Sequence, residues 1–201
     1  DGKSLDLMPS YSPDGKRIAY ITYNPRQRAI AYQLWLADAD GSNAQLVTEQ
    51  AEGGYYEWSP DSQWLVFNTL RDIDDPEFDT HSPPTRGLWI AGAGGTNAHL
   101  LYKVDGWRVI LSPNWSTNST LVLSAVKSFS SDNSETAAHQ VLRLFEAATG
   151  RELALEDVPD WMPGVNSFGM TWFSDHQQLF VTQGGDSKEP LTTYRLTLMA
   201  Q

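Results

Sequence analysis

Short apolar runs, each preceded by turn-forming residues, recur along the whole chain. They lie at 18–21, 64–67, 121–123 and 179–181, and each follows a segment rich in Ser, Pro, Asp or Asn. Runs of this length, rich in β-branched and aromatic residues, are typical of strands, whereas helices need longer periodic segments. The pattern therefore predicts an all-β chain built from many short strands.

The apolar runs belong to a longer repeat. Each run follows an anchor aromatic residue, and the anchors are about 50 residues apart. A second element, Leu-Trp-Leu at 34–36, returns as Leu-Trp-Ile at 88–90, with weaker copies at 141–145 and 194–198. A third, the turn and short strand at 40–47, returns at 94–101. Each repeat thus predicts four strands, a to d. The anchors of strand a are Tyr11, Trp58, Trp115 and Trp172.

The order Ser-Pro-Asp-Gly, Ile-Ala-Tyr, Leu-Trp-Leu-Ala-Asp-Ala-Asp-Gly resembles the TolB-type β-propeller repeat, a WD-like family. The resemblance covers residues 9–48 and 56–102 well and becomes weaker in the third and fourth repeats, where Thr117-Asn118-Ser119 and Ser174-Asp175-His176 replace Pro-Asp-Gly. It implies a β-propeller with four recognisable four-stranded blades. Similar repeats occur in periplasmic translocation proteins, kinase sensor domains and peptidase gating domains, so the resemblance is specific for fold and not for function.

The expected blades form a single domain over residues 1–201. They span approximately 8–48, 55–102, 110–155 and 168–201, and residues 1–7 resemble a strand d that would complete the last blade and remove an open sheet edge. Three arrangements stay open. Four blades close by themselves, the chain forms part of a larger propeller, or two chains close together.

Charge and composition exclude some partners. The chain has 25 acidic and 14 basic residues, a formal net charge of −11, and no cysteine. A negative field repels phosphate backbones and anionic lipid, so nucleic acid and membrane surfaces are not expected partners. No apolar run has the length of a membrane helix. The family resemblance, and not the composition, implies an extracytoplasmic location, either periplasmic or at the cell surface.

The variable segments all belong to one end of the predicted blades. The a–b and c–d turns are short and uniform, while the b–c loops (24–32, 71–86, 128–139 and 183–191) and the d–a loops (49–55, 104–111 and 156–168) are long and different in every repeat. Loops on a rigid scaffold often carry recognition, so this end is the candidate binding face. The alternative is that the loops are merely tolerated insertions.

Aromatic residues and an arginine in the d–a segments are the candidate contacts with a protein or peptide partner, because such residues commonly anchor interfaces. The alternative is that each caps the core under its loop. Tryptophans at repeat-equivalent strand positions are instead expected to pack between blades. The candidate contact residues are Tyr55, Trp107, Arg108, Trp161 and Met162.

The acidic loop at 71–81 is a weaker candidate. Asp72, Asp74 and Asp75 have a spacing that suits Ca²⁺, although the loop lacks the glycine and the final glutamate of an EF-hand. A solvated acidic loop is the favoured interpretation. No Gly-x-Ser-x-Gly motif and no zinc-type histidine spacing is present. The recurring Asp14, Asp61, Asn118 and Asp175 are expected to stabilise turns.

The sequence thus favours a non-catalytic module that binds a protein or peptide through its b–c and d–a loops, with no cofactor. Two alternatives stay open. One is the gating propeller of a prolyl oligopeptidase-like peptidase whose catalytic domain lies outside these residues. The other is a carbohydrate- or Ca²⁺-binding propeller.

Overall fold

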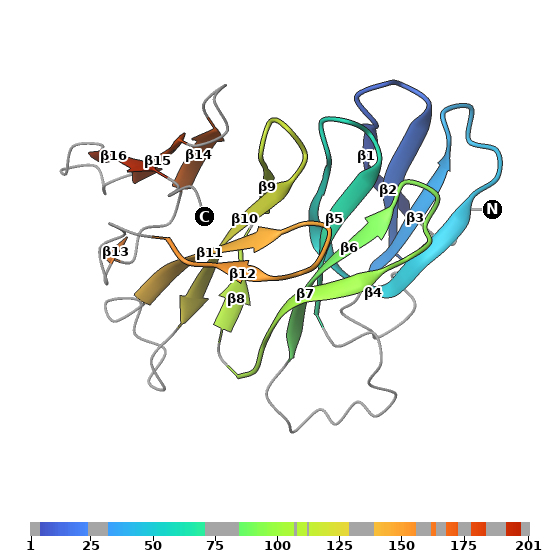
Figure 1. Cartoon of the computed structure of the whole chain (residues 1–201). Coiled ribbons are helices and arrows are strands. Elements are labelled where there is room, and N and C mark those ends of the chain that lie inside the picture. The colour runs from blue at the N-terminus through green and yellow to red at the C-terminus, as the bar shows by residue number, and fades with distance from the viewer. Residues whose placement is uncertain are drawn as a thin grey trace. The chain divides into compact units, whose positions relative to one another are not determined.

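The structure is a computed structural model that describes residues 5–23, 32–70, 85–106, 108–111, 113–128, 139–155, 162–163, 168–172, 178–183 and 192–197. All regular elements in these ranges are strands (Figure 1), as the apolar pattern predicts. The chain divides into two compact units, Asp1–Gly106 and Trp107–Gln201, which are described separately below.

The first unit holds one antiparallel sheet in which the strands lie side by side in chain order. Its strands are β1 (Leu5–Tyr11), β2 (Arg17–Tyr23), β3 (Tyr32–Asp38), β4 (Gln45–Trp58), β5 (Trp64–Thr69), β6 (Arg86–Gly92) and β7 (His99–Val104). These strands supply a to d of the first two predicted blades. Strand β4 serves twice, because it pairs with β3 through Leu46 and Thr48 and with β5 through Tyr56 and Trp58.

The continuity of β4 corrects the predicted d–a loop at 49–55, which is wrong because these residues lie within the strand. Backbone pairing explains the difference. Ala51 pairs with Tyr32 on one side and Thr69 on the other, so the strand keeps partners while it passes from one blade to the next. The register shifts between Ala51 and Tyr56. The variable segment is therefore a bulged strand and not a free loop.

The N-terminal segment joins the sheet of the first blade. Leu5 and Leu7 belong to β1, where they pair with Tyr23 and Ile21. That residues 1–7 also complete the last blade stays a prediction. Residues 1–4 lie outside the described part. The ladder shifts between Leu7 and Ser10, with Met8 at φ 50°, so a β-bulge interrupts β1.

The second unit holds two sheets. In the first, the order is β12 (Glu152–Leu153), β11 (His139–Glu146), β10 (Leu121–Ser128) and β8 (Arg108–Ile110), with β9 (Asn114–Trp115) on β10 and β13 (Met162–Pro163) on β11. The second sheet is β14 (Phe168–Trp172), β15 (Gln178–Gln183) and β16 (Thr192–Thr197). The predictions of d–a loops at 104–111 and 156–168 are partly wrong, because β7, β8 and β13 occupy parts of these segments.

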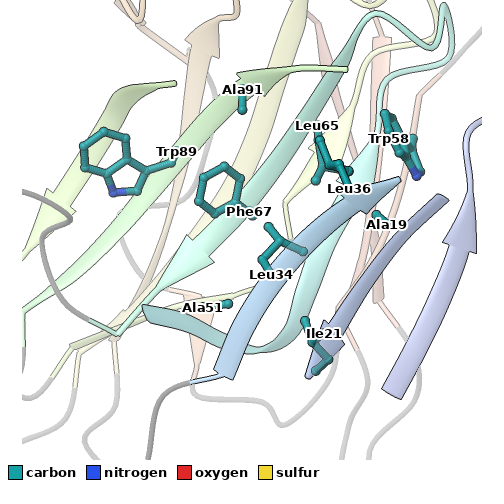
Figure 2. Close-up of a cluster of buried hydrophobic side chains, with 10 residues drawn as sticks. All are labelled: Ala19, Ile21, Leu34, Leu36, Ala51, Trp58, Leu65, Phe67, Trp89 and Ala91. Carbon is teal, nitrogen blue, oxygen red and sulfur yellow. The ribbon is translucent and has the colours of Figure 1, made fainter. Parts of the chain in front are cut away.

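Alternating side chains build the core between the first and second blades. Figure 2 shows Trp58, Phe67 and Leu65 directed toward Leu34 and Leu36, and all five are buried. Residues i and i+2 of a strand share one face, so β2 and β3 present one apolar face while β4, β5 and β6 present the opposing one. The members of this core are Ala19, Ile21, Leu34, Leu36, Ala51, Trp58, Leu65, Phe67, Trp89 and Ala91.

The same contact recurs in the second unit. Trp172 of the fourth blade packs against Leu123, Ala125, Leu142 and Leu144 of the third. These positions correspond through the repeat to Trp58 on Ala19, Ile21, Leu34 and Leu36. The predicted packing role is confirmed for Trp58, Trp89 and Trp172, which belong to the two core clusters. Trp115 is also buried, whereas Trp35 and Trp64 are only half-buried.

Hydrogen bonds from the second anchor fix the same interface. Trp58 Nε1 donates to Ser10 O at 3.1 Å, and the hydroxyl of Tyr56 donates to Met8 O. Burial raises the pKa of Tyr56 to about 12, so its hydroxyl keeps the donated proton at neutral pH. Asp14 N completes the set by donating to Ser62 Oγ at 3.0 Å. The two blades are therefore held by polar ties as well as by apolar packing.

Candidate functional site

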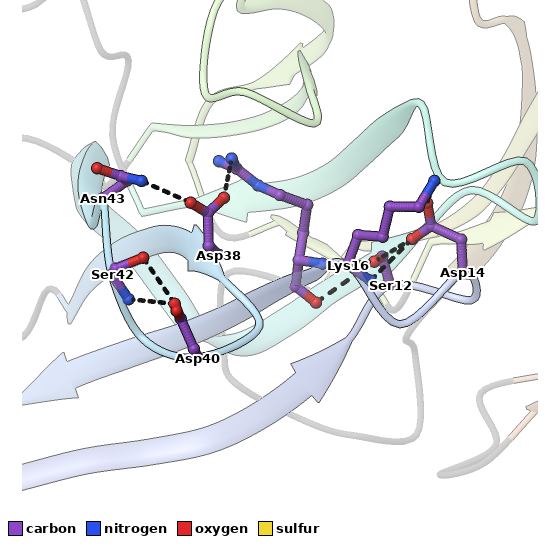
Figure 3. Close-up of polar contacts among 8 residues, drawn as sticks. Ser12, Asp14, Lys16, Asp38, Asp40, Ser42 and Asn43 are labelled. Atoms are coloured by element: carbon purple, nitrogen blue, oxygen red, sulfur yellow. Dashed lines mark hydrogen bonds and ion pairs between the residues drawn. The ribbon is translucent and has the colours of Figure 1, made fainter.

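The a–b turns form one end of the blades, and all three described copies have the same hydrogen bonds. In the first, Ser12 Oγ donates to Asp14 Oδ1 at 2.7 Å and accepts from Arg17 N at 3.0 Å (Figure 3). Asp14 Oδ1 also accepts from Lys16 N at 3.1 Å. Equivalent contacts join Ser59 to Asp61 and Ser116 to Asn118.

The turn-stabilising role predicted for these side chains is therefore confirmed for Asp14, Asp61 and Asn118. The fourth member, Asp175, lies outside the described residues. Each short polar side chain satisfies backbone N–H groups within its own turn, and this requires no residue from another repeat.

The c–d turn of the first blade is closed by bonds within the turn and by one bond from Arg17 of β2. Asp38 accepts from Arg17 Nη1 at 2.9 Å and from Asn43 Nδ2 at 2.6 Å, while Asp40 accepts from both the hydroxyl and the N–H of Ser42 (Figure 3). Hydrogen bonds from Ser42 hold the pKa of Asp40 below its ordinary value, as those from Ser12 and Lys16 do for Asp14. Both carboxyls are thus ionised acceptors in turns, which does not suit them for proton transfer at neutral pH.

The opposite end of the first unit, the loop end, carries an ion pair between distant strands. Arg86 Nε donates to Glu52 Oε1 at 2.7 Å, and the two side chains are only 15% and 16% exposed. Glu52 lies in β4 and Arg86 begins β6, so the pair bridges over the end of β5. Burial raises the pKa of Glu52, and the bond from Arg86 only partly opposes that rise. Strands β4 and β6 are thus joined by an ion pair whose burial costs desolvation energy but whose geometry is specific.

Tyrosines also lie at the loop end of the first unit. Tyr23 ends β2 and Tyr32 begins β3, and their ring centroids are 5.3 Å apart with the planes tilted by 42°. A Cβ added to Gly53 would lie 3.4 Å from the ring of Tyr32, so the chain passes close under that ring. Tyr55, two residues after Gly53 in β4, is 43% exposed. Sequence reasoning missed Tyr23 and Tyr32, although aromatic residues on both flanks of a long loop were a visible signal.

The candidate contact residues fall in different units. Tyr55 lies in β4 of the first unit, whereas Arg108 lies in β8 and Met162 in β13 of the second. Arg108 pairs with Ser128 and Met162 with Gln140, so both occupy the loop end of the third blade. Strands β10 and β11 lie between β8 and β13, so three ordinary strand spacings, about 14 Å, separate the two backbone positions. Tyr55, Arg108 and Met162 are strand residues near the loop end, so their assignment to loops is wrong. That they contact a partner stays a prediction.

The remaining candidates lie outside the described residues. They are Trp107 and Trp161 among the contact residues, and Asp72, Asp74 and Asp75 of the Ca²⁺ hypothesis. Within the ranges that the structure describes, no group of three or more His, Cys, Asp or Glu side chains is placed to hold a metal ion. No helix in those ranges is long and apolar enough to cross a membrane.

Comparison with known proteins places these features in a known architecture. No family model matches the chain. A protein of Agrobacterium fabrum, described only as uncharacterized, is 29% identical over 117 residues, which are 57% of this chain and 38% of that protein. The chain therefore spans well under half of this relative.

Solved structures cover nearly the whole chain. The β-propeller domain of the trilobed protease from Pyrococcus furiosus matches with a TM-score of 0.59 and 18% identity, over 96% of this chain and 55% of that one. TolB from Acinetobacter baumannii matches with 0.54 and 12%, over 97% and 41%. Prolyl oligopeptidase B from Galerina marginata matches with 0.65 and 13%, over 97% and 28%.

The chain has the β-propeller fold. Its blades resemble those of TolB and of peptidase propeller domains, as the repeat implies. The identities are low, so the likeness establishes architecture alone.

Proposed function

We propose that this chain is a non-catalytic β-propeller module that binds a protein or peptide through the loop end of its blades. The contrast between the two ends carries the proposal. At the turn end, the end of the blades formed by the a–b and c–d turns, the same hydrogen bonds within each a–b turn recur in every described repeat. The loop end of the first unit instead combines Tyr23, Tyr32 and Tyr55 with a buried ion pair. Rigid, amphipathic tyrosines on a fixed frame supply contact area at low entropic cost.

The polar groups at this end serve to hold the frame. Glu52 binds Arg86, and Thr85 Oγ1 donates to Asp105 Oδ1 at 3.1 Å. The first bond fixes the start of β6 relative to the bulge in β4, and the second fixes the end of β7 relative to the start of β6. A fixed frame favours recognition because less side-chain and backbone freedom is lost on binding.

The net charge of −11 favours a partner with a neutral or basic surface. The family resemblance supports an extracytoplasmic site of action, where such a partner would be met. Both points belong to the same proposal and are tested with it.

Peptide selection tests the proposal directly. A library of random 12-residue peptides displayed on phage is selected against the immobilised chain, and enriched peptides are titrated by fluorescence anisotropy. We expect Tyr55→Ala to weaken the selected peptides at least tenfold. Tyr11→Ala is the matched control, because Tyr11 is 59% exposed at the opposite end of its strand.

Two results would contradict the proposal. One is that no peptide is enriched over an unrelated acidic protein of similar size. The other is that the enriched peptides are insensitive to Tyr55→Ala and are weakened by Tyr11→Ala, which would move recognition to the turn end.

A peptidase gating module is the second candidate. The similarity to prolyl oligopeptidase B favours it, because this chain covers only 28% of that protein and the rest lies outside the propeller match. In that case a Gly-x-Ser-x-Gly segment follows in the same polypeptide. Reading the coding sequence downstream separates the two candidates, since absence of such a segment removes the peptidase.

A further inference from the structure

Two side-chain oxygens of β4 are buried without a hydrogen-bond donor. They are Oε2 of Glu52 and Oε1 of Gln50, and neither has a partner among the residues that the structure describes. The other carboxylate oxygen of Glu52 is occupied, since Oε1 accepts from Arg86 Nε. A buried acceptor without a donor is unfavourable, so folded proteins nearly always supply one. We call Glu52 Oε2 and Gln50 Oε1 the acceptor pair.

Both members of the acceptor pair belong to one side of β4. Gln50 and Glu52 are two residues apart, and alternate residues of a strand share a face. Ala51 between them is 4% exposed and packs in the core of the first unit, so its two neighbours lie on the other face. Arg86 shares that face, because its neighbour Gly87 is in the same cross-strand row as Ala51. The bond between Glu52 and Arg86 agrees with this placement.

The chemistry of the acceptor pair defines the missing group. An ionised carboxylate only accepts hydrogen bonds, and the amide oxygen of Gln50 also accepts. Lysine and arginine side chains carry several N–H donors and no acceptor, so they suit two oxygens without leaving an acceptor of their own unsatisfied. Burial raises the pKa of Glu52 even with Arg86 bound, as expected for a carboxylate that has too few donors. A second cation beside Glu52 would oppose that rise.

The surroundings favour a cation over a neutral donor. Glu49 is exposed one residue before Gln50, and the chain has a formal net charge of −11. Tyr55 is 43% exposed in the same bulged strand, and a tyrosine ring can pack on the stem or the charged end of a basic side chain. Glu52 is 16% exposed and Gln50 is half-buried, so the acceptor pair lies close to the surface and not in the core.

We propose that the acceptor pair binds a lysine or arginine side chain of the partner that is recognised at the loop end. The ammonium or guanidinium group donates to Glu52 Oε2 and Gln50 Oε1, while Arg86 keeps its bond to Glu52 Oε1. This specificity rests on the proposed function and names the chemistry of the partner.

Capped amino acids test the proposal without knowledge of the partner. N-acetyl-arginine methylamide and N-acetyl-lysine methylamide are titrated into the isotope-labelled full chain and followed by NMR, with the citrulline compound as the neutral isostere of arginine. We expect saturable shifts of the Gln50 side-chain amide and the Ala51 backbone amide. The citrulline compound should bind about fivefold more weakly than the arginine compound, because it lacks the charge and adds an acceptor oxygen.

Two substitutions that remove the same charge give the matched comparison. Glu52→Gln changes the carboxylate of the acceptor pair, whereas Glu49→Gln removes an exposed carboxylate from the same strand. We expect Glu52→Gln to weaken binding of the arginine compound about fivefold and Glu49→Gln to weaken it by less than about twofold. Gln50→Met removes the other acceptor and leaves the bond between Glu52 and Arg86 in place, so a loss of binding there does not depend on that bond.

Three results would overturn the proposal. The first is no saturable shift with either cation, which would assign the acceptor pair to an ordered water. The second is equal weakening by Glu52→Gln and Glu49→Gln, which would reduce the effect to long-range charge. The third is equal binding of the arginine and citrulline compounds. A shift with only one of the two cations supports the proposal and identifies the partner's residue.

The proposed function and this specificity can fail separately. Selected peptides that depend on Tyr55 but show no preference for lysine or arginine would overturn the specificity and leave peptide binding at the loop end intact. If no peptide is enriched while the capped cations still bind at Gln50, the proposed function fails and the cation site stays.

Discussion

The two ends of the first and second blades use the same strands but satisfy their polar groups in different ways. At the turn end, Asp14 and Asp61 bind partners two residues away. At the loop end, Glu52 binds Arg86 across a sequence separation of 34 residues. Local bonds can form in any copy of the repeat, whereas the distant pair requires the assembled sheet. The a–b turns therefore have the same hydrogen bonds in every described repeat, whereas the contacts at the loop end differ from one repeat to the next.

The largest effect is expected from breaking the distant pair. Arg86→Met leaves the Glu52 carboxylate buried without its cation, which should lower the free energy of unfolding by about 3–5 kcal/mol. Arg17→Met is the matched change at the turn end. Its partner Asp38 is 37% exposed, so the loss there should be about 1 kcal/mol or less.

Urea unfolding of the two variants measures this difference. Equal losses in Arg86→Met and Arg17→Met would show that the two ends do not differ in the way proposed.

Backbone packing gives a second comparison. A Cβ at Gly87 would overlap Trp89 Nε1 and approach Thr69 Oγ1, so Gly87→Ala should destabilise the chain by roughly 1–3 kcal/mol through overpacking. Gly94 at the turn end has no atom within 4 Å of the same added group. Gly94→Ala should therefore stay within about 0.5 kcal/mol of the parent chain. Thermal unfolding of both variants measures the difference in stability. A Gly87→Ala variant as stable as the parent chain would contradict the close contact with Trp89.

The turn bonds give a third and smaller effect. Asp61→Ala removes the acceptor for Ser59 Oγ and for Gln63 N, at a cost of about 1 kcal/mol. Asp61→Asn should be close to neutral, because Asn118 makes the same contacts in the third repeat. If chemical denaturation finds the two substitutions equally harmful, the charge of Asp61 matters more than its local hydrogen bonds.

The smallest expected effect is on the pH dependence of stability. The pKa of Glu52 is raised in the folded state above the ordinary 4.5, mainly by burial. Between those two values the folded chain binds more protons than the unfolded chain, so stability falls as pH rises from about 4.5 through the raised pKa. The Glu52→Gln variant should lack this component of the slope.

Denaturant midpoints measured at several pH values between 4 and 8 compare Glu52→Gln with the parent chain. Identical slopes in the two proteins would contradict the assigned cause of the raised pKa. A slope of opposite sign would show that Arg86 outweighs burial at this site.

The repeat was readable from the sequence because its signals are local. Ser-Pro-Asp-Gly and its variants specify turns through side chains that bond within a few residues, and the apolar runs between them specify which face of each strand is buried. The anchors Trp58 and Trp172 were recognised for the same reason. Position in the repeat sufficed to predict their burial.

The bulge in β4, the Tyr23–Tyr32 pair and the Glu52–Arg86 bond were not readable in this way. Residues 49–55 contain two glycines and polar side chains, which is typical of a loop. Pairing of Ala51 with strands on both sides overrides that preference. Interstrand hydrogen bonds outweigh weak local propensities, so a variable segment whose composition predicts a loop forms a strand in the structure.

By itself the sequence determined the all-β class, the strand order within each blade, the turns and the division of the blades into a constant and a variable end. All of these depend on residues close together in the chain, whose bonds and alternation need no partner from elsewhere. Only the tertiary structure decided that Glu52 meets Arg86 and that Tyr11 stays exposed where Trp58 is buried. Such differences between equivalent positions arise from what packs against each blade, and that depends on residues far apart in the sequence.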